Sequence, residues 1–282
     1  MPSEHQEPPR ARSGDAAGTG FPKRLFGILP MLLVAALLLT LATPFPERNA
    51  AYLDAAAERA LASFAIARGL NGVISVIQET EVGFSLGVRG SLEPGQVLDP
   101  LNDLVERFSL VALAAATLLW SLKLLGAFVV TPWPLVAALA LWLVGDLFVR
   151  RDRWGSREIG RLAHRLLRVF AVVWLFAAVT PVLIETVHTS RTVGDVYATA
   201  IGNLDSAGSA LADLGRYDGL PTPEALRGRV ARVAGLADAI SRDAVAVLAV
   251  YLFEVVLLPL FVFWLGARLL PATWVGERSP ST

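Results

Sequence analysis

Cysteine is absent from the sequence of 282 residues. A chain without thiols has no disulfide, no thiolate nucleophile and no zinc or iron–sulfur site built on cysteine. Charge is also scarce, since charged residues make up 18% of the chain and the formal net charge is zero. No basic field draws such a protein to nucleic acid, so we expect no nucleic-acid partner.

Histidine occurs only at His5, His164 and His188. None of the three has a second histidine at the spacing of metal ligands, so no metal site is predicted. The phosphate-binding motifs G-x-x-x-x-G-K-[ST] and G-x-G-x-x-G and the zinc-protease motif H-E-x-x-H are missing as well. We therefore predict a protein that is not an enzyme and that carries no cofactor.

Apolar residues are abundant: 54% of the chain is hydrophobic and the mean hydropathy is +0.55. This content exceeds the range of soluble domains and indicates a membrane protein. Arginine outnumbers lysine 23 to 2 and alanine is frequent, which is typical of a GC-rich bacterial genome. The expected location is therefore the bacterial inner membrane, crossed several times.

The first apolar run, Leu25–Thr43, has no charge and follows Lys23 and Arg24. Its 19 residues are long enough for a hydrocarbon core of ~30 Å. We interpret it as a retained helix; the alternative, a cleaved signal peptide, fits less well because the run exceeds the usual apolar region of such peptides. The preceding residues 1–22 are polar and rich in Pro and Gly, which predicts a disordered cytoplasmic head.

Three further apolar regions follow, at 108–149, 169–187 and 244–267. Pro132 and Pro134 divide the first of them, because proline breaks a helix interior but suits a helix start. Helices near 108–129 and 134–149 are therefore expected. Backbone groups in lipid must be satisfied within their own segment, so every span is predicted to be helical, and 268–282 forms a cytoplasmic tail.

The polar region 189–243 has a regular 4-3 spacing of apolar or small residues on both sides of a Gly- and Pro-rich turn at 215–225. This spacing predicts an antiparallel coiled-coil hairpin through which the protein associates with itself or with an envelope protein. The two series are Val193, Tyr197, Ala200, Leu204, Ala207, Leu211 and Leu214, and then Leu226, Val230, Val233, Ala237, Ile240, Ala244 and Val247.

The other polar region, 45–107, combines two patterns. An Ala-rich stretch, Asn49–Arg68, favours a helix with Leu53, Ala57, Ala60 and Phe64 on one face. The alternation of Val82, Phe84, Leu86 and Val88 with small or polar residues predicts a strand and a short β-hairpin. Asp99-Pro100 then suits a helix start, from which a helix is expected to run unbroken into the second apolar region.

Residues 95–109 read GQVLDPLNDLVERFS. This segment is similar to stretches of uncharacterised bacterial inner-membrane proteins. The resemblance covers only these residues and implies a membrane location without a function.

The distribution of arginine predicts the orientation in the membrane. Residues 150–168 contain seven arginines and are expected in the cytoplasm, because cytoplasmic flanks are enriched in Lys and Arg. The acidic regions 45–107 and 189–243 are expected outside. The run 108–149 then connects the outside to the cytoplasm and must cross the membrane an odd number of times, although it holds two predicted helices. We therefore favour four full spans with a partial segment at 134–149 over five full spans.

Four ionisable residues lie within the apolar regions: Lys123, Asp146, Glu185 and Glu254. Each costs ~2.5–3.5 kcal/mol at mid-bilayer, so such residues are functional candidates. We expect Lys123 to pair with Glu254, either as a fixed ion pair between two helices, which is favoured, or as an ion or proton relay. The candidates for binding lipid headgroups are Arg150, Arg151, Arg153 and Arg157.

The predicted fold is an all-α integral membrane protein with four or five transmembrane segments, an extracytoplasmic helical hairpin and a small α/β insertion. The leading functional hypothesis is a non-enzymatic envelope protein that acts by association or as a scaffold. The alternative is an ion or proton channel or transporter subunit that uses Lys123 and Glu254.

Overall fold

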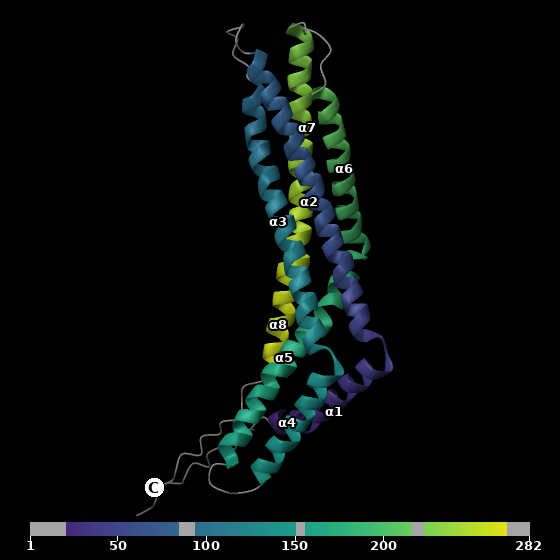
Figure 1. Ribbon diagram of the computed structural model, residues 1–282, viewed down its shortest axis with the longest axis vertical. Coiled ribbons are helices and arrows are strands. Elements are labelled where there is room, and N and C mark those ends of the chain that lie inside the picture. Colours follow the sequence, from purple (N-terminus) through teal and green to yellow (C-terminus); the bar gives the residue numbers. More distant parts are fainter. Residues whose placement is uncertain (1–20, 85–93, 151–155, 216–222, 270–282) are drawn as a thin grey trace, which may run out of the picture.

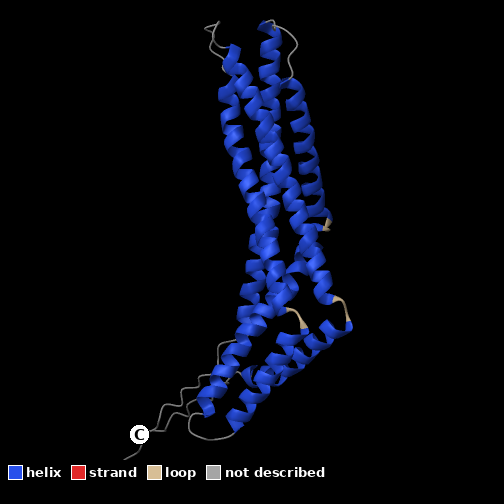
Figure 2. Cartoon of the chain, in the orientation of Figure 1, coloured by secondary structure: helices blue, strands red, loops and turns tan. Residues whose placement is uncertain are grey.

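The computed structural model describes residues 21–84, 94–150, 156–215 and 223–269, and within these ranges it contains helices and no strand (Figures 1 and 2). The elements are α1 (Phe21–Ala42), α2 (Phe45–Phe84), α3 (Pro94–Val129), α4 (Pro132–Arg150), α5 (Ser156–His188), α6 (Arg191–Gly215), α7 (Pro223–Tyr251), the π-helical η1 (Leu252–Leu257) and α8 (Leu258–Leu269).

After α1, the helices form four legs that run along the long axis of the molecule (Figure 1). The first leg is α2, and α3 followed by α4 returns. The third leg is α5 followed by α6, and α7, η1 and α8 return together. Within each composite leg the next helix starts within three residues of the last one, and Figure 1 shows α4 and α5 bent away from the axes of α3 and α6.

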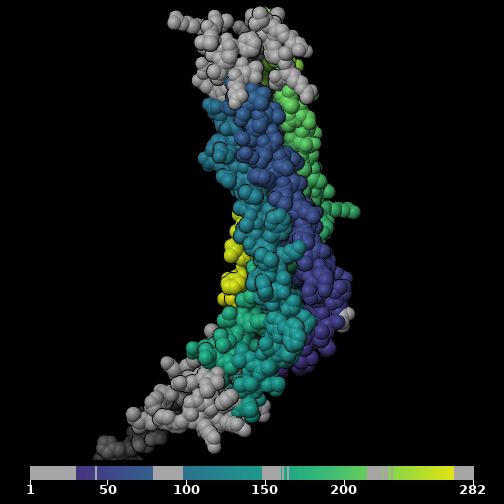
Figure 3. Space-filling model, in the orientation of Figure 1, coloured from purple at the N-terminus to yellow at the C-terminus, as the bar shows by residue number. Residues whose placement is uncertain are grey.

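At one end of the molecule, α6 and α7 pack against each other, α6 packs on α2, and α7 packs on α3. We call this four-helix bundle the stalk. The 4-3 spacing explains it, since most residues of both series are buried in one core with α2 and α3. Figure 3 shows α2 and α3 side by side along one face of the elongated molecule.

Within the predicted hairpin at 189–243, α6 and α7 pack against each other, and the extracytoplasmic position of this region stays a prediction. Residues 216–222, which make up most of the predicted turn at 215–225, and the side chains of Leu226 and Val230 lie outside the described part. The two apolar faces of the hairpin meet α2 and α3 as well as each other. The hairpin is half of a four-helix bundle rather than a free-standing pair. Supercoiling of the two helices stays a prediction.

Below the stalk, α5 and α8 take the places of α6 and α7. Helix α5 packs on α2, α3 and α8, so the four legs continue with different partners. At the far end, α1, α4 and the first half of α5 form a smaller cluster around Leu33, Leu135 and Leu167. The protein thus has three stacked tiers, with the exchange of helices between the first two at residues 188–191 and 251–258.

Four helical stretches are long and apolar enough to cross a membrane: Phe45–Gln78, Leu98–Val129, Arg165–His188 and Ala231–Leu269. Two shorter apolar helices, Pro30–Leu41 and Pro132–Leu147, accompany them among the described residues. The predicted count of four spans agrees with this number. Their identity differs, because α2 is among them although 45–107 was expected outside the membrane. Of the predicted span Leu25–Thr43, the stretch Pro30–Leu41 is found as one of the shorter apolar helices.

Exposed large apolar side chains gather at one end of the molecule. They lie on α1, on α3 from Leu110 onward, on α4, on α5 up to Val169 and on η1 and α8. On the described parts of α2, α6 and α7, by contrast, they are limited to Val76, Val196 and Val245. Such an extensive apolar surface is suited to lipid, whereas the surface of the stalk is polar.

The predicted α/β insertion is wrong where the structure describes it. Val82 and Phe84 lie at the end of α2, while Leu86 and Val88 lie outside the described residues. The helix persists because α2 pairs along its length with α3 and buries Ile74 and Ile77, so tertiary packing overrides a short local alternation. The predicted helix at Asn49–Arg68 is confirmed as part of α2.

Helix α3 begins at Pro94, before the predicted start at Asp99, and continues unbroken to Val129 as expected. Pro132 then starts α4, which confirms the division of 108–149. Helix α4 continues from the end of α3 at an angle to it and does not return alongside it (Figure 1). The number of times that these two helices cross the membrane stays a prediction.

Candidate functional site

Seven polar residues meet where α5 gives way to α6 and where α7 turns into η1. They come from five different elements, so their proximity depends on the tertiary fold. We call this group the junction cluster: Arg59 and Ser63 of α2, Glu185 and His188 of α5, Tyr197 of α6, Tyr251 of α7 and Glu254 of η1.

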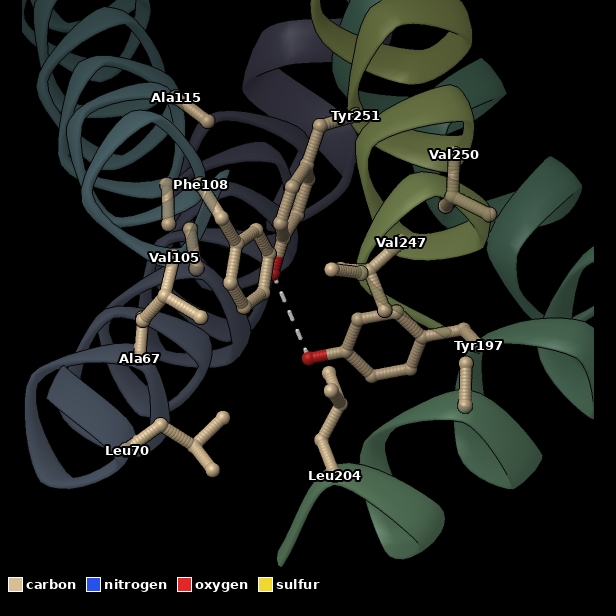
Figure 4. Packing of buried hydrophobic residues seen from close by; sticks show 14 of the residues in the cluster. Ala67, Leu70, Val105, Phe108, Ala115, Tyr197, Leu204, Val247, Val250 and Tyr251 are labelled. Atoms are coloured by element: carbon tan, nitrogen blue, oxygen red, sulfur yellow. Dashed lines mark hydrogen bonds between the residues drawn. The ribbon is translucent and has the colours of Figure 1, made fainter. Parts of the chain in front are cut away.

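Three hydroxyl groups surround the backbone carbonyl oxygen of Arg59. Tyr197 Oη, Tyr251 Oη and Ser63 Oγ each lie 3.1 Å from it. Ser63 Oγ is also 2.6 Å from Tyr251 Oη and 3.1 Å from Tyr197 Oη. The two tyrosine oxygens are 3.4 Å apart, as the dashed line in Figure 4 shows. These four oxygens, which we call the hydroxyl knot, therefore lie within hydrogen-bond distance of one another.

Each hydroxyl has one proton to donate, so three protons serve six oxygen–oxygen contacts in the hydroxyl knot. Only three of the contacts are hydrogen bonds at any instant, and the protons can be redistributed among them. The knot is enclosed by apolar side chains, including Phe108 of α3 and Val247 of α7 (Figure 4). Ser63 itself is fully buried, so the knot ties α2, α6 and α7 together inside the core.

Beside the hydroxyl knot, His188 Nδ1 lies 3.0 Å from Glu254 Oε1. The Glu254 side chain is only 4% exposed and that of His188 13%. The imidazole also packs edge-on against the ring of Tyr197, with centroids 5.0 Å apart. A buried carboxylate needs a partner that offsets its loss of hydration, and His188 is that partner.

Glu254 sits in the π-helical turn η1. A π-turn is a rare local widening of a helix and occurs frequently at functional sites. The sequence does hold a signal for this position: the 4-3 spacing of Ile240, Ala244 and Val247 continues to Tyr251 and Glu254. Extended past residue 247, the apolar series predicts that both residues face the core.

A second ion pair flanks the first. Arg59 Nη2 lies 3.3 Å from Glu185 Oε2, with each side chain a little over one fifth exposed. Glu185, which the sequence suggested as a functional candidate near the end of a span, precedes His188 by one turn of α5. Its contact with Arg59 makes it part of the junction cluster. Arg59, which the sequence did not single out, contributes both its guanidinium and its carbonyl oxygen.

The expected pairing of Lys123 with Glu254 is wrong. Lys123 Nζ instead contacts both carboxylate oxygens of Asp54, at 2.6 and 2.7 Å. Lys123 faces α2, whereas Glu254 faces the end of α5. The sequence alone could not predict the Asp54–Lys123 pair, because residues 45–107 were expected outside the membrane. Asp54 was therefore not considered as a partner for a residue within it.

The remaining candidates lie elsewhere. Asp146 is half-buried on α4, away from the junction cluster. Arg151 and Arg153 lie outside the described residues, and the side chains of Arg150 and Arg157 are likewise not described. The same holds for the side chain of His164. Among the residues that the structure describes, no group of three His, Asp or Glu side chains is placed to hold a metal ion.

Residues 83–87 read GFSLG, which matches the G-x-S-x-G of hydrolases. That motif works when a strand leads into the serine and a helix follows it. Here the α-helix α2 runs through Phe84, and Ser85 lies outside the described residues. The required strand is therefore missing, and no nucleophile is assigned.

These features define a class: the residues that the structure describes are nearly all helical and have the make-up of a multi-pass membrane protein, with four helices among them long and apolar enough to span a membrane. No protein-family model, curated protein or solved structure matches it.

Proposed function

We propose that this protein is a non-enzymatic bacterial inner-membrane protein whose stalk projects from the bilayer and associates with the stalk of a second copy. The observation that carries the proposal is an open groove along the outer side of α6 and α7. Two adjoining hollows of ≈ 600 and ≈ 570 Å³ form this groove.

Helix length supports a projecting stalk. Helix α2 has 40 residues, which corresponds to ~60 Å at ~1.5 Å per residue, about twice the thickness of a hydrocarbon core. Apart from Val76, Val196 and Val245, the exposed large apolar side chains of the described residues lie toward the opposite end of the molecule. A membrane that covers the apolar end leaves the polar stalk in water.

Five of the twelve residues that line the groove have small side chains, which allow another helix to approach closely. Ala207 and Ala210 line it on α6, and Gly235 and Ala239 line it on α7. A methyl group built at Gly235 would meet no atom within 4 Å. The space in front of this glycine is therefore open to a second molecule.

Charge favours a second copy as the occupant. Both copies are anchored in one membrane, so their stalks are parallel, and a two-fold axis along the stalk sets α6 of one copy against α7 of the other. Asp213 and Arg232 line the same hollow from α6 and α7. In the parallel pair, Asp213 of one copy faces Arg232 of the second copy at equal height, and the reverse contact repeats it.

The test is to fill the groove without disturbing the fold. Gly235→Leu places a bulky side chain in open space, and Gly69→Leu does the same on exposed α2, away from the groove. Native mass spectrometry of the protein in nanodiscs or mild detergent then measures the oligomer. We expect the wild type and Gly69→Leu to be dimeric and Gly235→Leu to shift at least tenfold toward monomer.

A wild-type protein that is monomeric in the native membrane would overturn the proposal, as would a Gly235→Leu variant with an unchanged dimer fraction. Crosslinking in cells through a cysteine at Ser206, which also lines the groove, separates the remaining outcomes. A product of twice the mass supports self-association. A product of another mass identifies an envelope partner in place of the second copy.

The orientation in the membrane is part of the proposal. The segment 150–168, which holds seven arginines, includes the end of α4 and the start of α5. These two helix ends lie at the end of the molecule opposite the stalk (Figure 1), which supports a cytoplasmic position for that end and an extracytoplasmic stalk. A channel or transporter role gains less support, because Lys123 and Glu254 bind different partners.

A further inference from the structure

We propose that the seam between α5 and α8 binds an anionic phospholipid: Arg168 and Arg268 hold the phosphate of its headgroup, and the exposed face of α8 carries its acyl chains. The inference rests on the membrane location within the proposed function and is independent of whether two stalks associate. It is carried by the way α8 packs on α5 and by the positions of the arginines on both helices.

Helix α8 is exposed over most of its surface and packs mainly on α5. Its buried residues recur every fourth position and therefore form one narrow stripe along the helix. Exposed apolar surface of this extent is suited to lipid. The buried stripe is Leu258, Val262 and Gly266, and the exposed large apolar residues are Leu260, Phe261, Phe263, Trp264, Leu265 and Leu269.

Two aromatic rings on the exposed face of α8 lead to Arg268. The rings of Phe261 and Trp264 are stacked, with centroids 6.2 Å apart and an interplanar angle of 27°. The guanidinium carbon of Arg268 lies 5.8 Å from the centroid of the Trp264 ring. Tryptophan and arginine are both favoured where acyl chains give way to headgroups. The Trp264 ring thus holds the guanidinium at the end of the apolar face.

Helices α5 and α8 run antiparallel (Figure 1). The rings of Phe176 and Phe263 meet edge to face, with centroids 6.1 Å apart. One turn further along α8, a methyl group built at Gly266 would lie 3.8 Å from Cγ1 of Val172. Each turn toward the end of α8 therefore corresponds to one turn toward the start of α5.

This register brings the arginines of the two helices together. Arg168 lies one turn before Val172 and hence on the face of α5 that carries α8. Arg268 follows Gly266 by two residues, so the two arginines differ in height by about one helical turn, ~5 Å. Arg165 lies a further turn away on the same face of α5 and is exposed. The long side chains of Arg168 and Arg268 can therefore reach one phosphate group.

The charge of these arginines calls for an anion. In the described part of the chain, no carboxylate forms an ion pair with Arg165, Arg168 or Arg268. Arginines at a membrane surface attract anionic lipids, and a guanidinium binds phosphate through two parallel hydrogen bonds. A zwitterionic headgroup brings an ammonium group that the arginines repel. The site should therefore prefer a headgroup with a net negative charge.

The apolar face of α8 also has the depth of one lipid leaflet. The stretch from Leu257 to Arg268 is ~16 Å long at ~1.5 Å per residue, about half of a hydrocarbon core of ~30 Å. The candidate spans Arg165–His188 and Ala231–Leu269 both end at these arginines. An acyl chain that lies along α8 thus places its phosphate beside Arg168 and Arg268.

The test compares phosphatidylglycerol with phosphatidylcholine of the same acyl chains. Each lipid is titrated into delipidated protein in a nonionic detergent, and bound lipids are counted by native mass spectrometry. The test variant is Arg168→Gln with Arg268→Gln. The matched control is Arg68→Gln with Arg191→Gln, which removes the same charge from exposed positions on α2 and α6.

We expect the wild type and the control to prefer phosphatidylglycerol. In the test variant the dissociation constant for this lipid should rise about thirtyfold, at about fivefold for each arginine, and the preference should disappear. The oligomer is read from the same spectra, so a loss of lipid binding is distinguished from a loss of stalk association.

A second measurement uses the wild type alone. In vesicles with equal amounts of the two lipids, one of them carries a photoreactive group in an acyl chain. We expect residues 257–265 to be labelled more strongly from phosphatidylglycerol than from phosphatidylcholine. Equal labelling from both lipids would overturn the proposal even if the variant did not fold.

Equal affinity of the wild type for the two lipids would also overturn the proposal, as would an equal loss of binding in the control variant. Displacement of phosphatidylglycerol by an excess of inorganic phosphate would assign the arginines to a free anion in place of a lipid. Retention of the lipid under that condition, together with the loss in the test variant, supports the site.

Discussion

Gly194 shows how closely two helices meet at the base of the stalk. A methyl group at this position would lie 2.6 Å from the backbone carbonyl oxygen of His188. The amide of Gly194 donates to the carbonyl of Ser190 at 2.9 Å, so the first turn of α6 is built directly on the end of α5. A side chain here can be accommodated only if backbone moves.

We therefore predict that Gly194→Ala destabilises the protein by about 1–3 kcal/mol, the usual cost of overpacking, and lowers the midpoint of thermal unfolding followed by circular dichroism. Gly202→Ala on the same helix is the control. A methyl group there meets no atom within 4 Å, and the gain in helix propensity is about 1 kcal/mol. Equal midpoints for the two variants would contradict the close approach.

Asp54 and Lys123 form a different kind of contact, a two-oxygen ion pair that is more than one third exposed at the surface of α2 and α3. It neighbours exposed apolar residues such as Leu124, so this part of the surface is suited to lipid. Water screens a pair weakly in that setting, and removal of one partner leaves the other charge uncompensated.

For this pair we predict a coupling energy of about 1–3 kcal/mol in a double-mutant cycle of Asp54→Asn and Lys123→Met, measured by unfolding in lipid. The pair Asp103–Arg107 on α3 is the comparison, because it is highly exposed, at 61% and 73%. Its coupling should be about 0.3–0.5 kcal/mol. Similar coupling for both pairs would show that Asp54 and Lys123 face water.

At the scale of elements, the hydroxyl knot clamps α6 and α7 to α2. Because Tyr197 and Tyr251 share Ser63 and the carbonyl of Arg59, loss of one hydroxyl lets the other two rearrange. Each of Tyr197→Phe and Tyr251→Phe should therefore cost about 1 kcal/mol.

The double Phe variant leaves Ser63 and the Arg59 carbonyl with each other and should differ from the sum of the single changes by at least 0.5 kcal/mol, the range of coupled neighbours. Denaturant unfolding of the four proteins measures this difference. Simple additivity would mean that the two tyrosines act separately and that the short oxygen contacts are not shared.

The breaks between elements follow local chemistry in some places and packing in others. Pro132 starts α4 where a proline is favoured at a first helical position. The break between α5 and α6 has no proline and arises because the chain must move from one bundle to the next. In the other composite leg, the π-helical turn η1 joins α7 to α8 at the height of the break between α5 and α6.

At the scale of the whole molecule, the stalk and the cluster of α1, α4 and the first half of α5 lie at opposite ends. Ser209 and Ala231 lie exposed on the stalk, whereas Arg165 lies exposed on α5 toward the opposite end. With single cysteines in this cysteine-free chain, a membrane-impermeant thiol reagent should label Ser209→Cys and Ala231→Cys in intact cells. Arg165→Cys should react only after permeabilisation.

Labelling of Arg165→Cys together with the other two in intact cells would place both ends on one side and contradict a membrane between them. Labelling of Arg165→Cys alone would invert the orientation. The stalk would then be cytoplasmic, although the fold and the segregation of its ends would be unchanged.

Much of the fold was accessible from local patterns. The apolar runs, the division at Pro132 and the 4-3 spacing that begins at Val193 depend on residues a few positions apart, and periodicity reports them directly. The error at Val82 and Phe84 shows the limit of this approach, because alternation over a few residues is weaker than the pairing of α2 with α3.

Local patterns in the sequence are enough to show that the chain is helical, apolar enough for a membrane and free of cysteine chemistry. Which side chains meet depends on the tertiary fold, as in the contacts of Lys123 with Asp54, of Glu254 with His188, and of two tyrosines with one carbonyl. Periodicity gives the buried face of each helix, but the partner of a buried charge depends on which helices are neighbours and at what height they pack.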